Sequence, residues 1–213
     1  MQQPGKTNLL LAWIIANSIG GFLIGFLENN GAQFMVTLFL SGAVVGSLQW
    51  VVLRWMGKRG LPWVIWPIAS GLGWILSTLL SIVTLSTTTI AGSLMAQFGL
   101  GEAFWINLIL RPIEISCMAA AQGIILGYST HLKARILGIW ILASCLGGAL
   151  HGAVSALLCD AFCPVLPSAL VGIVHSMGWA VYGIITGFAL VQILSVTGGE
   201  PSAPPVETVP LEE

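Results

Sequence analysis

The sequence predicts an all-α membrane protein of six transmembrane helices, arranged as three parallel helical-hairpin repeats with both termini in the cytoplasm. Three observations lead to this prediction: a scarcity of charge, six long apolar stretches and a Trp-containing phrase that occurs three times. Of the 213 residues, 56% are hydrophobic and 7% are charged, against about 45–50% and about 25% in soluble domains. The seven Lys and Arg residues form no basic stripe, so we expect no nucleic-acid partner.

Six stretches are long enough to cross a bilayer. A spanning helix needs about 20 mostly apolar residues, because the hydrocarbon layer is about 30 Å thick and each residue rises about 1.5 Å. The stretches are residues 9–27, 33–53, 63–84, 112–130, 136–158 and 168–194. Backbone polar groups in lipid must pair within their own segment, so each stretch is expected to be helical. The first stretch shares the repeat of the third and fifth, so we interpret it as a retained helix and not as a cleaved signal peptide.

The charged residues of the connections orient the predicted bundle. Basic residues precede the first stretch and lie in the second–third and fourth–fifth connections: Lys6, Arg54, Lys58, Arg59, Lys133 and Arg135. The opposite connections carry the acidic residues Glu28, Glu102 and Asp160. The positive-inside rule therefore predicts cytoplasmic termini.

The connection at residues 85–111 is long, and its later part is apolar. We expect segment 102–108 to lie along the outer membrane interface, with its aromatic pair at headgroup depth. Pro112 is then read as the first helical position of the fourth span, with Glu114 in its first turn. The alternative begins the span near Ala103 and buries Arg111 and Glu114 in lipid, where ionisable groups are costly and usually functional.

The chain divides into a membrane bundle and a polar end. We assign residues 1–194 to the bundle and residues 195–213, rich in Pro and Glu, to a disordered cytoplasmic tail. The expected repeats cover residues 9–53, 63–130 and 136–194.

The repeated phrase begins with Trp and ends with Gly seven residues later. Its copies are Trp13-x-Ile15-Ala16-Asn17-x-Ile19-Gly20, Trp66-x-Ile68-Ala69-Ser70-x-Leu72-Gly73 and Trp140-x-Leu142-Ala143-Ser144-x-Leu146-Gly147. The Trp, the polar residue and the Gly share one helix face. We expect the Trp side chains in the interfacial belt at the cytoplasmic side, and the small residues in close contact with another helix.

The even-numbered stretches supply candidate partners for that contact. Each contains a Gly-x3-Gly pair: Gly42 and Gly46, Gly123 and Gly127, and Gly183 and Gly187. Such pairs let helices approach closely in lipid, and three copies, each after a Trp phrase, predict three parallel hairpins. The expected helix-packing set is Gly20, Gly42, Gly46, Gly73, Gly123, Gly127, Gly147, Gly183, Gly187, Asn17, Ser70 and Ser144.

The phrase Gly42-x3-Gly46-x2-Gln49-Trp50-x2-Leu53-Arg54, together with the Trp-x2-Ala-x3-Gly phrases, resembles a group of small uncharacterised multi-pass membrane proteins frequent in cyanobacteria. The resemblance covers most of residues 12–190 and implies architecture and habitat, a bacterial inner (plasma) or thylakoid membrane, but no activity. In the Gly-x3-Gly register, Thr130 and Leu190 stand where Gln49 would repeat.

Two histidines and two cysteines form the remaining candidate site. A hairpin of the fifth and sixth spans would bring His151 and His175 to similar depth near the outer face, close to Cys159 and Cys163. Imidazoles at that depth could bind haem or a pigment, or hydrogen-bond locally. The cysteines could instead form a short-loop disulfide in an oxidising compartment. Their spacing matches no zinc signature, so no metal site is predicted.

The leading functional hypothesis is a non-enzymatic accessory or assembly component that packs with membrane lipids and other membrane proteins, with no catalytic residue and no obligatory cofactor. The first alternative is a carrier or channel for a small neutral or amphipathic solute. The second alternative is pigment or haem binding through His151 and His175.

Overall fold

The computed structural model describes residues 5–32, 34–55, 63–83, 87–128 and 132–197, and all regular structure within these ranges is helical. The elements are α1 (Lys6–Asn29), α2 (Phe34–Trp55), the 3₁₀ turn η1 (Trp63–Ile65), α3 (Trp66–Val83), α4 (Thr87–Phe98), α5 (Glu102–Gly127), α6 (Lys133–Phe162) and α7 (Ser168–Thr197). Five candidate spans are long and apolar enough to cross a membrane, namely α1, η1 with α3, α5, α6 and α7. The predicted all-α membrane class is confirmed. The expected tail lies outside the described residues from position 198 on.

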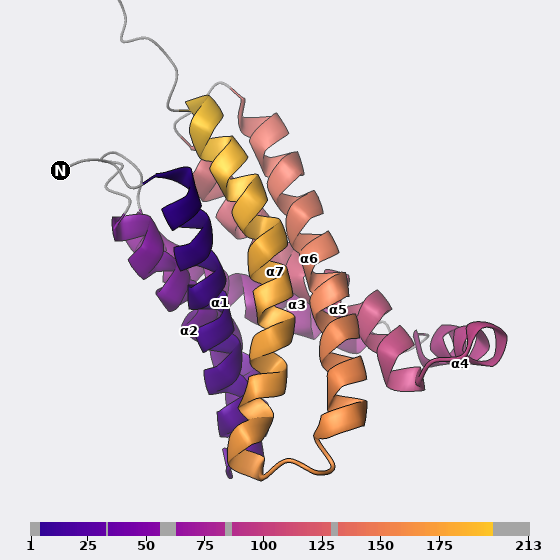
Figure 1. Ribbon diagram of the computed structural model, residues 1–213. Coiled ribbons are helices and arrows are strands. Elements are labelled where there is room, and N and C mark those ends of the chain that lie inside the picture. Colours follow the sequence, from indigo (N-terminus) through magenta and orange to yellow (C-terminus); the bar gives the residue numbers. More distant parts are fainter. Residues whose placement is uncertain (1–4, 33, 56–62, 84–86, 129–131, 198–213) are drawn as a thin grey trace, which may run out of the picture.

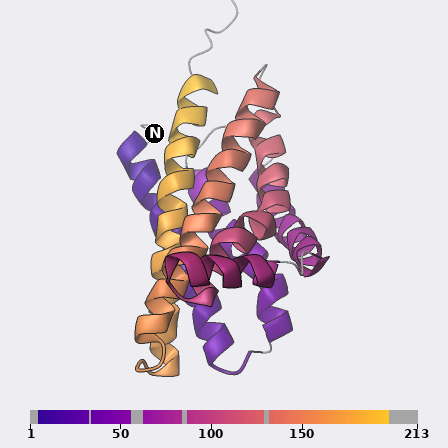
Figure 2. The same cartoon turned by 90° about the vertical axis from the view of Figure 1, so that its right-hand side faces the viewer.

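Helix α5 corrects the predicted fourth span. It runs without interruption from Glu102 to Gly127 and contains Pro112 in its interior, so Pro112 does not begin the helix and the segment expected along the interface is the first part of α5. A proline within a helix leaves a carbonyl without its usual donor, but membrane helices tolerate this where neighbouring groups compensate. The carbonyl affected here is that of Leu108, four residues before Pro112. Cys145 Sγ of α6 lies 3.6 Å from the carbonyl oxygen of Pro112 itself, so α6 packs against α5 at this position. The element that lies across the bundle is instead α4 (Figure 1 and Figure 2).

The six long helices form a closed ring. Each contacts the next in the order α1, α2, α3, α5, α6 and α7, and α7 returns to α1. The start of α1, the start of α6 and the end of α7 lie at one end of the bundle (Figure 1). Helix α4 projects from the side of this ring and contacts α5.

The three copies of the Trp phrase lie on α1, α3 and α6, which we call the Trp helices. One face of each Trp helix meets the next helix around the ring. A Cβ atom built on Gly20 would lie 2.9 Å from Val45 Cγ2 of α2, and one on Gly73 would lie 2.6 Å from Met118 Cα of α5. At the third equivalent contact, a Cβ on Gly147 would lie 3.0 Å from Tyr182 Cδ2 of α7. The Gly at the end of the phrase thus touches a neighbouring helix in all three copies.

The three Gly-x3-Gly pairs of α2, α5 and α7 do not contact the preceding Trp helix of their own hairpin but the next one around the ring. The pair on α2 lies against Ser70 of α3, and the pair on α5 lies against Leu137 and Lys133 of α6. The pair on α7 lies against α1, where a Cβ on Gly183 would be 3.0 Å from Ile14 Cα. Each pair therefore packs on the Trp helix that comes next around the ring, and α7 closes the ring on α1.

The three repeated Trp side chains lie inside the ring. Trp13, Trp66 and Trp140 are fully buried, and their rings meet edge to face with centroid separations of 6.2, 6.1 and 5.9 Å. We call these three residues the Trp cluster. The expectation that they occupy a lipid-facing interfacial belt is wrong, because a polar partner inside the bundle accepts a hydrogen bond from each indole N–H.

Candidate functional site

A belt of buried amide and hydroxyl groups surrounds the Trp cluster. Trp66 Nε1 donates to Gln49 Oε1 (3.0 Å), Trp140 Nε1 donates to Gln122 Oε1 (3.2 Å), and Trp13 Nε1 donates to Thr186 Oγ1 (2.9 Å). Each acceptor stands on the helix that precedes its Trp helix around the ring. The residues that share the role of Gln49 as an indole acceptor are therefore Gln122 and Thr186. Of the two positions in the Gly-x3-Gly register, Leu190 has no polar side chain, and Thr130 lies outside the described residues.

Two of these acceptors, Gln49 and Gln122, also donate a hydrogen bond to the Trp helix on their other side. Gln49 Nε2 donates to Asn17 Oδ1 (2.9 Å), and Gln122 Nε2 donates to Ser70 Oγ (2.8 Å) and to Gln49 Oε1 (3.1 Å). We call the set Asn17, Gln49, Ser70, Gln122 and Thr186 the polar belt. Within it, Asn17 and Ser70 accept bonds across helix contacts. Such bonds contribute about 0.6–2 kcal/mol each in a bilayer, and this half of the bundle is filled by side chains that hold one another in place.

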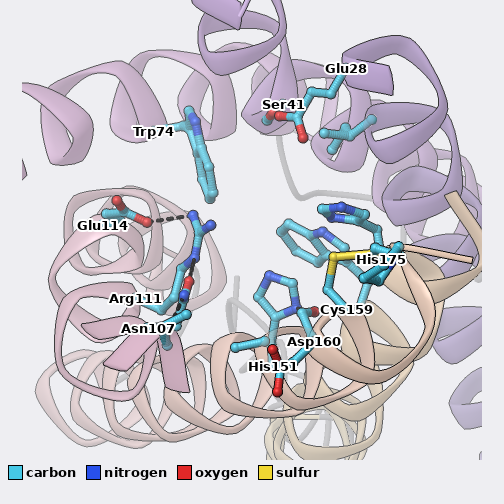
Figure 3. Close-up of a pocket in the computed structure, with 17 residues that line it drawn as sticks. Glu28, Ser41, Trp74, Asn107, Arg111, Glu114, His151, Cys159, Asp160 and His175 are labelled. Carbon is cyan, nitrogen blue, oxygen red and sulfur yellow. Dashed lines mark hydrogen bonds and ion pairs between the residues drawn. A yellow bond between two sulfur atoms is a disulfide. The ribbon is translucent and has the colours of Figure 1, made fainter. Parts of the chain in front are cut away.

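The opposite half of the bundle contains a cavity of about 610 Å³. Figure 3 shows it inside the ring, with side chains entering from several helices. Its polar lining consists of Glu28, Ser41, Asn107, Arg111, Glu114, His151, Ser155, Asp160 and His175, and its aromatic lining of Trp74 and Trp179. The cavity begins about 8–11 residues along the helices from the Trp cluster, or about 12–17 Å at 1.5 Å per residue.

Glycines on neighbouring helices provide the space for the large side chains of this cavity. A Cβ built on Gly25 would lie 2.6 Å from the His175 ring, and the ring of Trp179 lies directly against Gly21. The Arg111 side chain crosses Gly152 so closely that no side chain fits there. These Gly residues form two further Gly-x3-Gly pairs, Gly21 with Gly25 and Gly148 with Gly152, which face inward to the cavity lining.

An ion pair of α5 lies in this cavity. Arg111 Nη1 donates to Glu114 Oε2 at 2.6 Å, and Arg111 Nε donates to Asn107 Oδ1 at 3.0 Å. The side chains of Arg111 and Glu114 are 32% and 13% exposed. Both side chains line the cavity inside the ring (Figure 3). This arrangement resembles the alternative placement of the fourth span, in which Arg111 and Glu114 lie within the helix.

The two histidines line the same cavity. The His151 ring lies 4.6 Å from the Trp179 ring, and its Nδ1 is 3.4 Å from Ser155 Oγ. No group of three or more His, Cys, Asp or Glu side chains in the described part of the chain is placed to hold a metal ion. Haem or pigment binding through His151 and His175 stays a prediction.

Cys159 and Cys163 are joined by a disulfide at the end of α6, beside the cavity that both residues line. Cys117 and Cys145 are free and half-buried. The disulfide ties the last turn of α6 to the start of the turn toward α7, so it holds the rim of the cavity in one conformation.

No family model matches the chain, and no curated protein or solved structure matches it. The site is therefore interpreted from its own residues.

Sequence reasoning found some of these residues and missed others. It named the two histidines as candidate ligands and gave Arg111 and Glu114 a functional interpretation only in the alternative placement of the fourth span, and all four residues line the cavity. It missed Trp74 and Trp179, which lie among other apolar residues in the sequence. The signal that was available is the Gly-x3-Gly pairs of α1 and α6. Each pair begins with a glycine eight residues after the Trp, and this glycine is not part of the repeated phrase.

Proposed function

We propose that the chain crosses the membrane six times, as three hairpin units around an axis along the membrane normal, with both termini in the cytoplasm. Helix α2 supports the sixth crossing because its 22 residues would extend about 33 Å. The threefold recurrence of the Trp, Gln or Thr, and Gly contacts supports a repeated unit. The basic residues at the start of α1 and α6 favour a cytoplasmic location for that end, in a bacterial inner or thylakoid membrane.

The function that this geometry supports best is binding and transfer of a small amphipathic solute, without chemical conversion. The observation that carries this proposal is a polar and aromatic cavity in one half of the ring, while the buried side chains of the Trp cluster and polar belt fill the other half. A site open to one side and closed to the other is the arrangement that alternating access requires. Transport would then need the Trp cluster to separate.

We place this proposal ahead of the assembly role expected from the sequence, which stays a prediction. That expectation rested on the interpretation of the small and polar side chains of the spans as helix-packing residues. All nine glycines of the expected packing set contact neighbouring helices of this same chain, so they leave no glycine groove for a partner. Lipids remain the expected surroundings of the outward-facing apolar side chains.

Uptake into proteoliposomes tests the proposal. The purified protein is reconstituted and offered a panel of radiolabelled amines, alcohols and carboxylic acids of similar size. We expect uptake of at least one class above empty liposomes, and its loss in Ala156→Trp, because Ala156 lines the cavity and an indole there would fill it.

Ala134→Trp is the matched control, since Ala134 is exposed at the opposite end of α6, and it should keep uptake. The proposal fails if the folded wild-type protein moves no member of the panel, or if both Trp variants behave alike.

A further inference from the structure

Two buried hydroxyl groups lack a hydrogen-bond partner where α7 meets α6. They are Ser144 Oγ on α6 and Tyr182 Oη on α7, and both residues are fully buried. The Tyr182 hydroxyl lies beside Ser144, yet neither oxygen is in hydrogen-bond geometry with any atom of the described residues. A buried hydroxyl without a partner is costly, and native proteins commonly satisfy such groups with ordered water.

The two equivalent helix contacts, of α2 with α1 and of α5 with α3, fill this place with a carboxamide. Gln49 Nε2 donates to Asn17 Oδ1 at 2.9 Å, and Gln122 Nε2 donates to Ser70 Oγ at 2.8 Å. Ser144 is the counterpart of Asn17 and Ser70 in the third copy of the repeated phrase. The pattern therefore calls for a hydrogen-bond donor beside Ser144.

Thr186, which takes the role of the Gln residues on α7, does not supply that donor. Its hydroxyl accepts a bond from Trp13 Nε1 at 2.9 Å and donates to the carbonyl oxygen of Tyr182 at 2.8 Å, so its single proton is already used. Thr also lacks the carboxamide with which Gln crosses the helix contact. A water molecule can take the place of that group, because it is small and both donates and accepts hydrogen bonds.

The two hydroxyl groups lie between the Trp cluster and the cavity. On α6, Ser144 stands between Trp140 of the Trp cluster and His151 of the cavity lining. The Tyr182 ring is 5.2 Å from the ring of Trp179, which lines the cavity. A water molecule held by these hydroxyl groups would therefore continue the polar lining of the cavity toward the polar belt.

We propose that Ser144 and Tyr182 bind one buried water molecule, which is the polar link between the cavity and the polar belt. The water donates to Ser144 Oγ and accepts from Tyr182 Oη, so it does for the contact of α7 with α6 what Gln does for the other two contacts. The site goes beyond the proposed function and does not depend on it, because it follows from the hydrogen bonds of the belt. It makes this contact the hydrated one of the three.

A crystal structure of the wild-type protein, grown in a lipid mesophase and showing ordered water, tests the site directly. We expect a density peak within hydrogen-bond distance of both Ser144 Oγ and Tyr182 Oη. If the two oxygens instead bond each other with no peak between them, the proposal is wrong.

Radiolytic hydroxyl labelling, read by mass spectrometry, tests the site in lipid nanodiscs, because bound water generates the radical beside the side chain that it hydrates. After correction for intrinsic reactivity, we expect faster oxidation of Tyr182 than of Trp66, which is equally buried. Ser144→Ala removes one partner of the water and should slow Tyr182 oxidation about fivefold, the change in occupancy that one lost hydrogen bond implies. Oxidation of Trp179 should stay unchanged, since it reports on the cavity.

Ser18→Ala is the matched control, because Ser18 Oγ donates to the carbonyl oxygen of Ile14 in its own helix at 2.9 Å, and Tyr182 oxidation should equal that of the wild type. Thr186→Gln keeps the Ser144 hydroxyl but puts a carboxamide where the water binds, so it should also slow Tyr182 oxidation. This second variant separates loss of the water from a folding defect of Ser144→Ala. Wild-type oxidation of Tyr182 as slow as that of Trp66, or unchanged oxidation in both Ser144→Ala and Thr186→Gln, would overturn the proposal.

Discussion

Gly73 illustrates at the scale of one residue how closely these helices pack. A Cβ atom at this position would lie 2.6 Å from Met118 Cα and 2.9 Å from the carbonyl oxygen of Cys117. Both are backbone atoms, so a methyl group is accommodated only if α3 and α5 move apart. We expect Gly73→Ala to lower the free energy of unfolding by about 1–3 kcal/mol, measured by denaturant titration in detergent micelles.

Gly138→Ala provides the comparison on α6. No atom lies within 4 Å of a Cβ built there, and alanine loses less conformational entropy than glycine in a helix. The same titration should show unchanged or higher stability, by up to about 1 kcal/mol. Equal losses in the two variants would show that steric contact is not the cause.

Trp66 gives a second prediction at this scale. Its Nε1 donates to Gln49 Oε1 at 3.0 Å, and Phe keeps an aromatic ring while removing the donor. Trp66→Phe should cost about 1–3 kcal/mol of stability, because it also leaves an unfilled volume beside Trp13 and Trp140. Trp55→Phe, at an exposed position, should change the thermal midpoint little. A similar midpoint shift in both variants would contradict a structural role for the Trp cluster.

The polar belt is incomplete at one of its three interfaces, which leads to a prediction at the scale of helix pairs. Gln49 and Gln122 each accept a bond from one Trp helix and donate to the other, but Thr186 Oγ1 donates to the carbonyl of its own Tyr182 at 2.8 Å. Among the described residues, no hydrogen bond from Thr186 reaches Ser144, the counterpart of Asn17 and Ser70.

Replacing Thr186 by Gln should supply the missing bridge between α7 and α6. We expect Thr186→Gln to raise the free energy of unfolding by about 1 kcal/mol, the scale of one interhelical hydrogen bond in a membrane. In Thr186→Gln/Ser144→Ala the gain should vanish, which a double-mutant cycle measures as a coupling energy. A gain that persists without the Ser144 hydroxyl would mean that added packing, and not the bridge, is responsible.

The sequence predicts the positions of most helices but not all of the contacts between them. Apolar length placed every long helix except α5 to within a few residues, because lipid demands a fixed span. Pro112 was misleading, since it lies inside α5, and membrane helices tolerate a proline in their interior as well as at their first position. The partner of Gly183 was also beyond reach: its contact with Ile14 joins the two ends of the chain, and local spacing carries no signal about ring closure. The Trp cluster was misjudged because an interfacial and an interior Trp look alike in sequence.

The whole molecule differs between its two ends, and this difference predicts one-sided access. The cavity lining includes Asp160 and the disulfide at the end of α6, whereas the buried Trp cluster and polar belt lie nearer the start of that helix, where Lys133 stands. Ser155 lines the cavity, and Ser70 is fully buried in the belt. Single cysteines in a variant whose four native cysteines are replaced by alanine therefore report on both ends.

A membrane-impermeant maleimide should label Ser155→Cys only from the outer side and Lys133→Cys only from the cytoplasmic side, in intact cells compared with inverted vesicles. Ser70→Cys should react from neither side, because the closed half excludes water as well as reagent. Labelling of Ser155→Cys and Lys133→Cys from the same side would refute the proposed orientation. If an added solute made Ser70→Cys reactive from the cytoplasm, we would infer that the Trp cluster parts during binding, since Ser70 is fully buried one turn after Trp66. That solute-dependent reactivity distinguishes a carrier, whose seal must open, from a protein that only binds its ligand.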